Sequence, residues 1–348
     1  MSTLTLADDR IMLKHGAGGR AMRRLIAESF LTAFHTEPEE PAGCIGLGAM
    51  DDGAAVRIGN RWLVFTTDSH VIQPLFFPGG DIGRLSISGV VNDLAMMGAT
   101  EVLGLSCSIV VEEGFPRADL TRILASMRQT CDEAKAAVLT GDTKVMGRGE
   151  IDGLVINTAG IALTDRVVTD RGLHPGDRII VTGTIGDHGM AVMACRHGLA
   201  LDGDVKSDVA PLNGLIAAAL AVEPDAVTAM KDPTRGGVAS VLHEMAEKGH
   251  VGIVVDEQAL PVRLPVRGVS ELVGIDPLLV ANEGKAVMAV RPHAVGAVLA
   301  ALRGHPLGRD AAVIGVCTDE RPGVVILETG FGRRLLVEPD GEPMPRIC

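Results

Sequence analysis

The sequence predicts an α/β protein with two domains, and three observations support this fold class. At 348 residues the chain is too long for one small hydrophobic core. Short apolar runs, typical of buried strands, alternate with segments whose apolar residues have helical spacing. A stretch rich in charged and turn-forming residues, 164–177, interrupts this alternation. We therefore expect an N-terminal domain over 1–165, a C-terminal α/β domain over 166–338 and a flexible tail over 339–348.

The N-terminal half predicts the order strand, helix, strand, helix, strand, strand. Apolar spacing and length distinguish the two kinds of element. The expected strands are 62–68, 101–111 and 151–163, the expected helices are 81–97 and 120–131, and the short run 138–140 leads into a glycine-bearing loop.

A second α/β pattern follows the charged stretch. Its apolar runs have strand length, and its longer segments have one apolar face. The expected strands are 178–181, 251–255, 286–290, 312–316 and 324–327, and the expected helices are 187–197, 236–248 and 293–302.

The last ten residues place a thiol, Cys348, at the end of an arm with an unusual composition. Residues 339–345 include three prolines and one glycine, which disfavour both helix and central strand. Fully extended, such an arm spans about 31 to 36 Å. It can carry sulfur into an active site of this chain or of a partner. A frayed end with an incidental cysteine remains an alternative.

Composition excludes several classes of function. The chain is 47% hydrophobic and 22% charged, as expected of a globular protein in water. With 2% aromatic residues and a net charge of -12, it lacks the stacking surface and the basic charge that nucleic-acid binding needs. It has neither a long apolar run for a membrane span nor a signal peptide at the start, so we expect a cytoplasmic protein. No cysteines form a CxxC pair, which disfavours a zinc site.

Carboxylates stand at the ends of several predicted elements. Asp51 and Asp52 precede small residues, Asp68 ends an apolar strand, and Asn92-Asp93 interrupts an apolar helix. A buried charge at Asp93 costs free energy unless a cation or a hydrogen-bond partner meets it. If these carboxylates converge, Mg²⁺ with its preference for oxygen ligands is the natural cation. For each aspartate alone, a turn or cap role is the alternative.

Three glycine-bearing segments could bind phosphate. His15-Gly16-Ala17-Gly18-Gly19 offers backbone N–H groups, and Asp232-Pro233-Thr234-Arg235-Gly236-Gly237 directly precedes a predicted helix, whose N-terminus favours anions. Gly141-Asp142-Thr143-Lys144 reads as a strand-to-loop turn with a lysine, but it does not have the spacing of a Walker A loop. Each motif alone is equally compatible with an ordinary turn or helix cap.

Glu283 is a candidate acid or base. It lies in Asn282-Glu283-Gly284-Lys285, which interrupts two apolar strands. A surface turn is the alternative at this position.

Taken in order, these motifs resemble the ATP-binding superfamily of aminoimidazole ribonucleotide synthetase, selenophosphate synthetase and thiamine-monophosphate kinase. Within it, the chain is most similar to the hydrogenase maturation family HypE. The resemblance covers nearly the whole chain. Selenophosphate synthetases usually carry a cysteine or selenocysteine and a lysine in the first glycine-rich loop, where this chain has Gly19 and Met22. The motifs that carry the resemblance are 15–19, 66–83, 141–145, 232–237 and the final Pro345-Arg346-Ile347-Cys348.

The resemblance implies a fold and a reaction. It implies a two-domain synthetase-like fold with ATP in the cleft between the domains, and a homodimer formed through the N-terminal, ATP-binding domains. In the implied reaction, the carbamoyltransferase HypF loads a carbamoyl group onto Cys348. ATP then drives dehydration of the S-carboxamide to a thiocyanate, and the cyano group passes to iron on the HypC–HypD scaffold during [NiFe]-hydrogenase maturation.

The resemblance also implies roles for individual residues. The implied catalytic residues are Cys348, Glu283 and Lys144, with Lys144 either pairing with Glu283 in proton transfer or stabilising phosphate. The implied ATP-binding residues are Gly16, Gly18, Gly19, Asp51, Asp68, Asn92, Asp93, Gly141, Asp142, Thr143, Asp232, Arg235, Gly236 and Gly237. The implied Mg²⁺ ligands are Asp51 or Asp52, together with Asp68, Asp93 and Asp232.

Two other functions remain open from the sequence. One is an ATP-dependent kinase or synthetase of the same superfamily that acts on a small molecule, with Cys348 not catalytic. The other is an acidic scaffold or metallochaperone whose tail thiol binds nickel or iron, although one thiol without other soft ligands makes a poor metal site.

Overall fold

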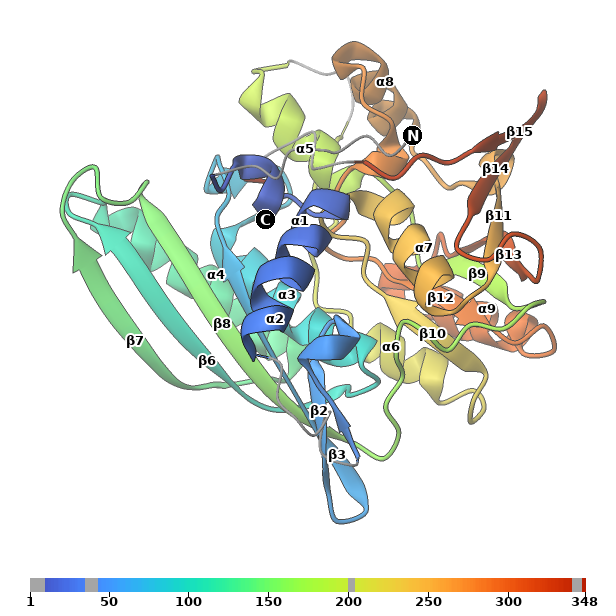
Figure 1. The fold of residues 1–348 in the computed structure, drawn as a ribbon. Coiled ribbons are helices and arrows are strands. Elements are labelled where there is room, and N and C mark those ends of the chain that lie inside the picture. The colour runs from blue at the N-terminus through green and yellow to red at the C-terminus, as the bar shows by residue number, and fades with distance from the viewer. Residues whose placement is uncertain (1–9, 35–42, 200–203, 340–345) are drawn as a thin grey trace.

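The computed structural model describes residues 10–34, 43–199, 204–339 and 346–348. Two β-sheets, one in each half of the chain, lie side by side with helices packed on them (Figure 1). The predicted α/β class is therefore confirmed.

The N-terminal sheet has six strands in the order β1-β2-β3-β8-β6-β7. Neighbouring strands are antiparallel except β6 and β7, which run parallel. The strands are β1 (Cys44–Ile45), β2 (Ala54–Ile58), β3 (Arg61–His70), β6 (Glu101–Glu112), β7 (Val138–Met146) and β8 (Leu154–Thr164), and β4 (Phe76–Phe77) pairs separately with β5 (Gly80–Asp81).

Helix α3 (Ile82–Met96) forms the centre of the molecule. It begins where the Asp81 side chain accepts a hydrogen bond from the Arg84 backbone N–H at 2.9 Å. Almost every residue of α3 is buried, because it packs on β3 and β8, against α4 (Arg117–Ala134) and against α6 (Asn213–Leu220) of the other domain. Its buried polar residues therefore face the junction between the two domains.

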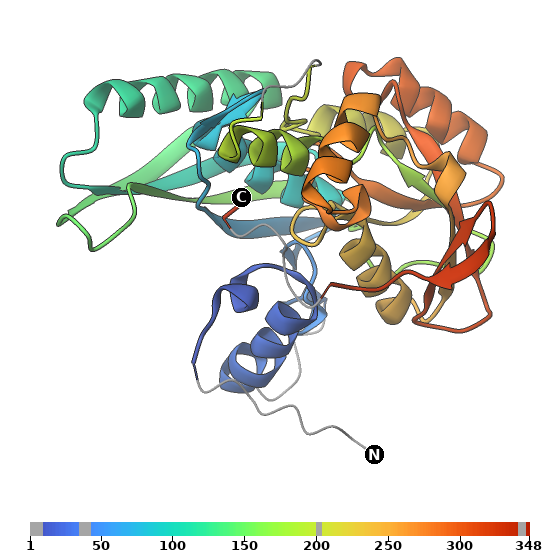
Figure 2. The same ribbon diagram turned by 90° about the horizontal axis from the view of Figure 1, so that it is seen from above.

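The opposite face of the N-terminal sheet is only partly covered. Figure 2 shows α4 along one face of the sheet and the N-terminal helices on the other side. These are α1 (Gly19–Leu25) and α2 (Thr32–Phe34), joined by helical residues 26–31. Phe65, Leu103 and Ile161 remain 46%, 45% and 41% exposed on strands of this sheet.

The C-terminal sheet has seven strands in the order β10-β12-β9-β13-β11-β14-β15. Helices α5, α7, α8 and α9 belong to the same half. The strands are β9 (Arg178–Val181), β10 (Val227–Lys231), β11 (Gly252–Asp256), β12 (Val287–Val290), β13 (Ala312–Thr318), β14 (Val325–Thr329) and β15 (Gly332–Leu335), and the helices are α5 (Asp187–Arg196), α7 (Gly237–Lys248), α8 (Leu264–Val273) and α9 (Val295–Gly304).

The expected elements are observed in their expected order with one correction, but the sequence analysis did not predict several others, among them α1, β2, α6, β10 and α8. Residues 141–144 do not form a loop after 138–140, because β7 continues through them to Met146. Gly141 permits this pairing, since a Cβ atom there would lie 2.1 Å from the Cys107 carbonyl oxygen on β6. Gly141, which follows the short apolar run 138–140, therefore marks a close contact between β7 and β6 and not a turn.

The N-terminal sheet ends at Thr164, and the C-terminal sheet begins at Arg178. These positions lie on either side of the domain boundary predicted at 165/166, which stays a prediction. The intervening segment packs on both halves, since Val168 N–H donates to the Met97 carbonyl and Thr169 forms a β-bridge with Ala229. In the described part of the chain, no helix is long and apolar enough to cross a membrane.

Candidate functional site

The last three residues are docked against the N-terminal domain. Val71 N–H donates to the Cys348 carbonyl at 3.2 Å, and Gln73 N–H donates to the Arg346 carbonyl at 3.4 Å. Between them the Ile347 side chain is buried, at 2% exposure, and its carbonyl lies 2.8 Å from His188 Nε2. The rest of the tail, 340–345, lies outside the described residues. The thiol-bearing end of the tail is thus held by backbone hydrogen bonds, by the His188 and Arg196 side chains at its carbonyls, by an Arg346–Asp152 ion pair and by the buried Ile347 side chain.

Cys348 lies in the wall of a pocket of about 550 Å³. The pocket collects segments that are far apart in the sequence: Ile11–Leu13, Gly16, Ala17, Ser69, Val71, Arg235 and Arg346–Cys348. The glycine-rich segment, the end of β3, the residues before α7 and the tail therefore meet at one pocket.

Arg235 links the tail to the interior of the site. Negative charge at Cys348 is the largest cause that raises its pKa, and Asp68, Glu283 and Asp93 contribute as well. The Arg235 guanidinium also donates to the Gly16 carbonyl at 3.4 Å. One cation therefore lies between the tail residue and the buried carboxylates.

The first glycine-rich segment packs tightly on the residues before α7. Gly18 has φ +79°, and a Cβ atom there would lie 2.7 Å from the Arg235 Cβ. Gly236 and Gly237 also have positive φ, and Gly236 is the N-cap of α7. Backbone N–H groups at a helix N-terminus form an anion site, so the two glycine-bearing motifs meet at a surface suited to phosphate.

Three carboxylates, those of Asp68, Asp93 and Asp232, repel one another behind Arg235. Burial, followed by Asp232, Asp68 and Asp52, raises the pKa of Asp93 well above its usual range. Burial, followed by Asp52, likewise raises the pKa of Asp232 well above its usual range. Burial also acts on Asp68, but His70 Nε2 at 3.1 Å and Arg235 outweigh it and lower the pKa to about 2.

This cluster fits a divalent cation. Its donors are carboxylate oxygens, which Mg²⁺ prefers, and a cation would relieve the repulsion that raises these pKa values. Among the described residues, no three His, Cys, Asp or Glu side chains are grouped closely enough to hold a metal by themselves. That is expected of Mg²⁺ at a nucleotide site, where one or two carboxylates act together with phosphates and water.

Asp51 and Asp52 belong to a neighbouring network that the sequence did not reveal. Lys231 forms an ion pair with Asp52, and its Nζ lies 3.6 Å from Asp170 and 3.7 Å from Glu244. Burial, Asp170 and Asp52 together raise the pKa of Asp51 to about 7. Because Lys231 neutralises Asp52, this aspartate already has a cation of its own. Its assignment to Mg²⁺ stays a prediction.

Glu283 is in the interior, so the surface-turn alternative is wrong. Its side chain is 3% exposed, and Oε1 has no hydrogen-bond partner among the described residues. Burial, followed by Asp232, Asp208 and Asp68, raises its pKa well above the usual range. Asn92 on α3 donates to the Glu283 carbonyl at 3.2 Å, which attaches this loop to the N-terminal domain.

Gly141, Asp142, Thr143 and Lys144 are not brought to this cluster within one chain. Asp142 pairs with Ser108, Ser108 with Asn157, and Asn157 with Ser69. The motif is therefore level with the end of β3 but three strands away, about 14 Å. Lys144 is 71% exposed and lies 3.6 Å from Asp142, so Glu283 and Lys144 do not form a pair inside this chain.

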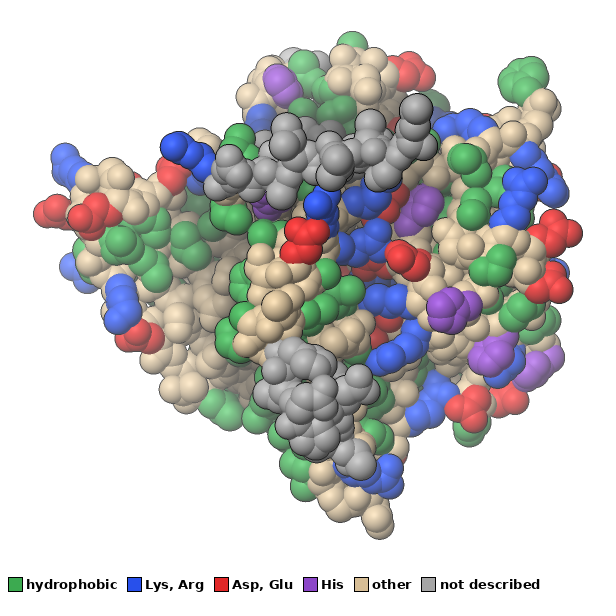
Figure 3. Space-filling model, viewed as in Figure 1, with side chains coloured by type: hydrophobic (Ala, Val, Ile, Leu, Met, Phe, Trp, Pro, Cys, Tyr) green, Lys and Arg blue, Asp and Glu red, His purple; other side chains and the backbone are tan. Residues whose placement is uncertain are grey.

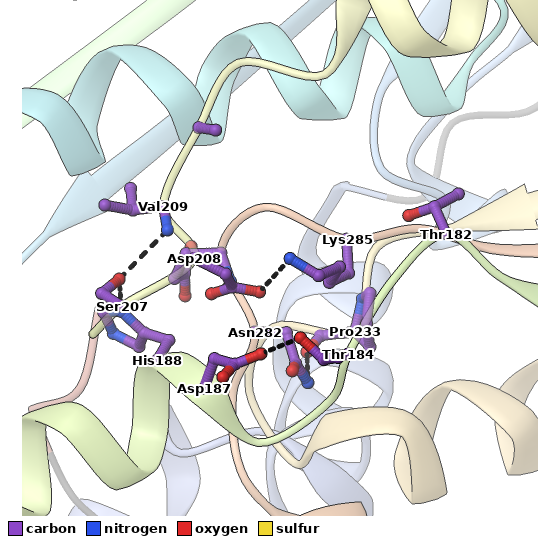
Figure 4. Close-up of polar contacts among 12 residues, drawn as sticks. Thr182, Thr184, Asp187, His188, Ser207, Asp208, Val209, Pro233, Asn282 and Lys285 are labelled. Atoms are coloured by element: carbon purple, nitrogen blue, oxygen red, sulfur yellow. Dashed lines mark hydrogen bonds and ion pairs between the residues drawn. The ribbon is translucent and has the colours of Figure 1, made fainter. Parts of the chain in front are cut away.

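A second polar network, around Asp187, Asp208 and His188, was also missed (Figure 4). Lys285 lies 3.1 Å from Asp208, whose carboxylate accepts a hydrogen bond from the Glu283 N–H at 3.0 Å. Asp187 accepts from Arg263 at 2.6 Å. The one sequence signal was that Asp187 and His188 open an otherwise apolar helix.

Charged side chains also surround the start of the tail. Figure 3 shows basic and acidic groups gathered along the seam between α1 and α7. There Arg23 donates to both oxygens of Glu338, at 2.7 and 2.8 Å, and Arg23 also pairs with Glu247. The residue at which the tail begins is thus tied to α1.

Comparisons with known proteins identify the family of this chain. The N-terminal domain model of AIR synthase related proteins matches residues 50–164, and the corresponding C-terminal domain model matches 174–328. The carbamoyl dehydratase HypE of Rhizobium leguminosarum bv. viciae is 45% identical, over 99% of this chain and 97% of that protein.

Solved structures give the same result. HypE in a HypE–HypF complex is 42% identical, with a TM-score of 0.83 over 90% of this chain and 99% of that one. HypE in complex with ATP is 40% identical, with a TM-score of 0.79 over 97% and 100%. The chain therefore belongs to the HypE family of carbamoyl dehydratases, which is built from the two AIR synthase related domains.

Proposed function

We propose that this protein binds ATP and uses it to dehydrate an S-carboxamide on Cys348 to a thiocyanate, which supplies cyanide for iron in [NiFe]-hydrogenase maturation. The observation that carries this proposal is the docking of Cys348 in a pocket that also contains Arg235 and the glycine-rich segment. A kinase of small molecules has no use for a thiol held there. The structure of a related HypE in complex with ATP supports ATP as the nucleotide that this protein binds.

The chemistry balances with ATP as the only co-reactant. The carboxamide oxygen attacks the γ-phosphorus, ADP leaves, and one N–H proton is released. The C–O bond then breaks with phosphate as the leaving group, the second N–H proton is released, and S–C≡N remains. Phosphorylation is needed because an amide oxygen is otherwise a poor leaving group.

Glu283 is the proton acceptor in this proposal. Its raised pKa means that its carboxylate, once ionised, binds a proton more strongly than an exposed glutamate does. Within the part of the chain that the structure describes, its buried Oε1 has no hydrogen-bond partner, which makes it available to a substrate N–H. Arg235 and the N-terminus of α7 bind the phosphates that come to lie between Glu283 and the glycine-rich segment.

Mg²⁺, when bound, neutralises charge on the transferring phosphoryl group. One or two of Asp68, Asp93 and Asp232, which repel one another behind Arg235, would hold it together with phosphate oxygens and water. Without phosphate and metal, burial and the repulsion between these carboxylates raise the pKa of Asp93 and of Asp232 well above the usual range.

A second copy of the chain supplies Lys144 in this proposal. The β7 edge that carries 141–144 is exposed throughout, and Leu139 and Val145 on it are 67% and 69% exposed. Such an apolar edge is suited to pairing with another copy. The proposal therefore requires a homodimer, formed through the N-terminal domains, in which the sheets overlap so that Lys144 of one copy reaches Glu283 of the other.

Mixing two inactive variants tests this arrangement. Glu283→Gln and Lys144→Ala proteins should each fail to dehydrate the carboxamide. After subunit exchange, part of the activity should return, because half of the sites in a mixed dimer contain both native groups. Mixtures that stay inactive, with mixed dimers present, would contradict a shared site.

The partners follow from the same reaction. HypF is the proposed carbamoyl donor, since a relative forms a HypE–HypF complex, and the HypC–HypD scaffold is the proposed acceptor of cyanide. Phosphate release from isolated, carbamoylated protein tests the coupling to ATP. It should equal the loaded Cys348 and be absent from a Cys348→Ala variant that still binds ATP. Equal phosphate release by that variant would favour a small-molecule kinase.

A further inference from the structure

His188 makes a side-chain hydrogen bond to the backbone of the docked tail. Its ring is fully buried on α5, and Nε2 lies 2.8 Å from the Ile347 carbonyl oxygen. Phe77 packs edge-on against the ring, with centroids 5.4 Å apart at 90°. This contact uses a main-chain atom next to Cys348, so it acts on the position of the tail whatever group the sulfur carries.

The surrounding hydrogen bonds fix which ring nitrogen donates. A carbonyl oxygen can only accept, so Nε2 carries the proton and Nδ1 is the acceptor. Ser207 Oγ lies 2.8 Å from Nδ1 and donates to it, and the same oxygen accepts from Val209 N–H at 3.1 Å (Figure 4). The chain of donors therefore runs in one direction, from Val209 through Ser207 and His188 to the tail.

The residue after Ser207 connects this chain to the proton acceptor. Asp208 accepts a hydrogen bond from the Glu283 backbone N–H at 3.0 Å and forms an ion pair with Lys285 at 3.1 Å. A Cβ atom on Gly284 would lie 1.9 Å from the Asp208 carbonyl oxygen, so the two segments touch with no room for a side chain. Ser207 therefore contacts His188, which binds the tail, and the next residue, Asp208, contacts the loop that carries Glu283.

We propose that His188 is a positioning residue that, through its hydrogen bond to the Ile347 carbonyl, holds Cys348 in register with Glu283 for the dehydration step. This inference rests on the proposed function for its purpose. The docking that it explains can be measured without that function. His188 touches neither the sulfur nor ATP in this account.

A matched pair of substitutions isolates the Nε2 donor. In His188→Gln the amide nitrogen reaches the position of Nε2 and can still donate to the tail. In His188→Asn it reaches only the position of Nδ1, and the Ile347 carbonyl loses its donor. Both variants are neutral, polar and similar in size, and thermal melts of both establish that they fold.

The first readout is alkylation of Cys348 by iodoacetamide in the protein alone, followed on the C-terminal peptide by mass spectrometry. Alkylation should be about five- to tenfold faster in His188→Asn, the change expected from loss of one hydrogen bond. His188→Gln should stay near the wild-type rate. Equal rates in all three proteins, or equal acceleration in both variants, would overturn the proposal.

The second readout is single-turnover dehydration of the carbamoylated protein at saturating ATP. His188→Asn should lower the rate with unchanged ATP affinity, and His188→Gln should restore it. If His188→Asn does not fold, Ser207→Ala takes its place, since the loss of its hydroxyl removes the group that orients the ring, and it should raise alkylation less. Unchanged alkylation in Ser207→Ala would then overturn the proposal.

The two readouts test the proposed role of His188 and the proposed function independently of each other. Faster alkylation in His188→Asn together with no dehydration in wild type supports the tail contact and refutes the proposed function. Normal dehydration in wild type together with unchanged alkylation in His188→Asn supports the proposed function and refutes the proposed role of His188.

Discussion

Replacing Lys231 with methionine should destabilise the protein strongly. The Lys231 side chain is 11% exposed and forms ion pairs with Asp52, Asp170 and Glu244, of which Asp170 also pairs with a second cation, Lys248 at 2.5 Å. Methionine fills a similar volume but leaves the buried carboxylates without this charge. Removing one partner of a buried ion pair costs about 3–5 kcal/mol. For a domain of this size, such a loss lowers Tm by about 6–20 °C.

Circular dichroism melts of Lys231→Met and a matched control measure this effect. The control is Lys206→Met, because Lys206 lies 2.9 Å from Asp204 while both side chains are more than half exposed. Exposed pairs contribute no more than about 1 kcal/mol, so its Tm should hardly change. A similar Tm loss in both variants, or none in Lys231→Met, would refute the view that this network is held by buried charge.

A second substitution identifies the source of the loss. In Lys231→Met, adding Asp52→Asn removes the carboxylate that lost its cation, so part of the stability should return. The double variant should therefore be more stable than the sum of the two single changes predicts. Strict additivity would show that Lys231 and Asp52 are not energetically coupled.

Three further predictions follow from the described geometry. Gly18→Ala should weaken ATP binding at least tenfold by calorimetry, because its Cβ would collide with the residues before α7, whereas Gly268→Ala on α8, with open space around it and away from the pocket, should bind normally. Val145→Asp should shift sedimentation from dimer to monomer, whereas Leu272→Asp, at the same 69% exposure on α8, should not. The Asp51 pKa is raised to about 7 by burial and neighbouring carboxylates, so its contribution is favourable in acid and is lost as pH rises through about 7. In urea titrations with a chelator, wild type should therefore lose more stability between pH 5 and 8 than Asp51→Asn, and parallel curves would contradict this.

The pattern of apolar residues was sufficient to predict most elements near the site. The strand 62–68 and the helix 81–97 correspond to β3 and α3, because a run of β-branched and apolar residues and a helical apolar face are local signals. The sequence predicted a loop after 138–140, which was wrong, because all nine residues of β7 are exposed and the strand has no buried face. Without burial, no apolar alternation is present to extend the strand.

The candidate site was predictable residue by residue but not as an arrangement. Asp93 and Glu283 stood out because a charge in an apolar setting needs a partner. Lys231 did not stand out, since its partners Asp52 and Asp170 are more than 60 residues away in the sequence and meet it only through tertiary packing. His188 was equally inconspicuous, because it binds a main-chain carbonyl, which leaves no trace in side-chain patterns.

Mass spectrometry of the Cys348 peptide tests the central claim most directly. The protein would be incubated with HypF, carbamoyl phosphate and Mg-ATP, with Cys348→Ala as control. We predict that the peptide first gains the mass of a carbamoyl group and then, with ATP, loses one water to give a thiocyanate. An unmodified Cys348 peptide, under conditions where ATP is still hydrolysed, would contradict the tail mechanism.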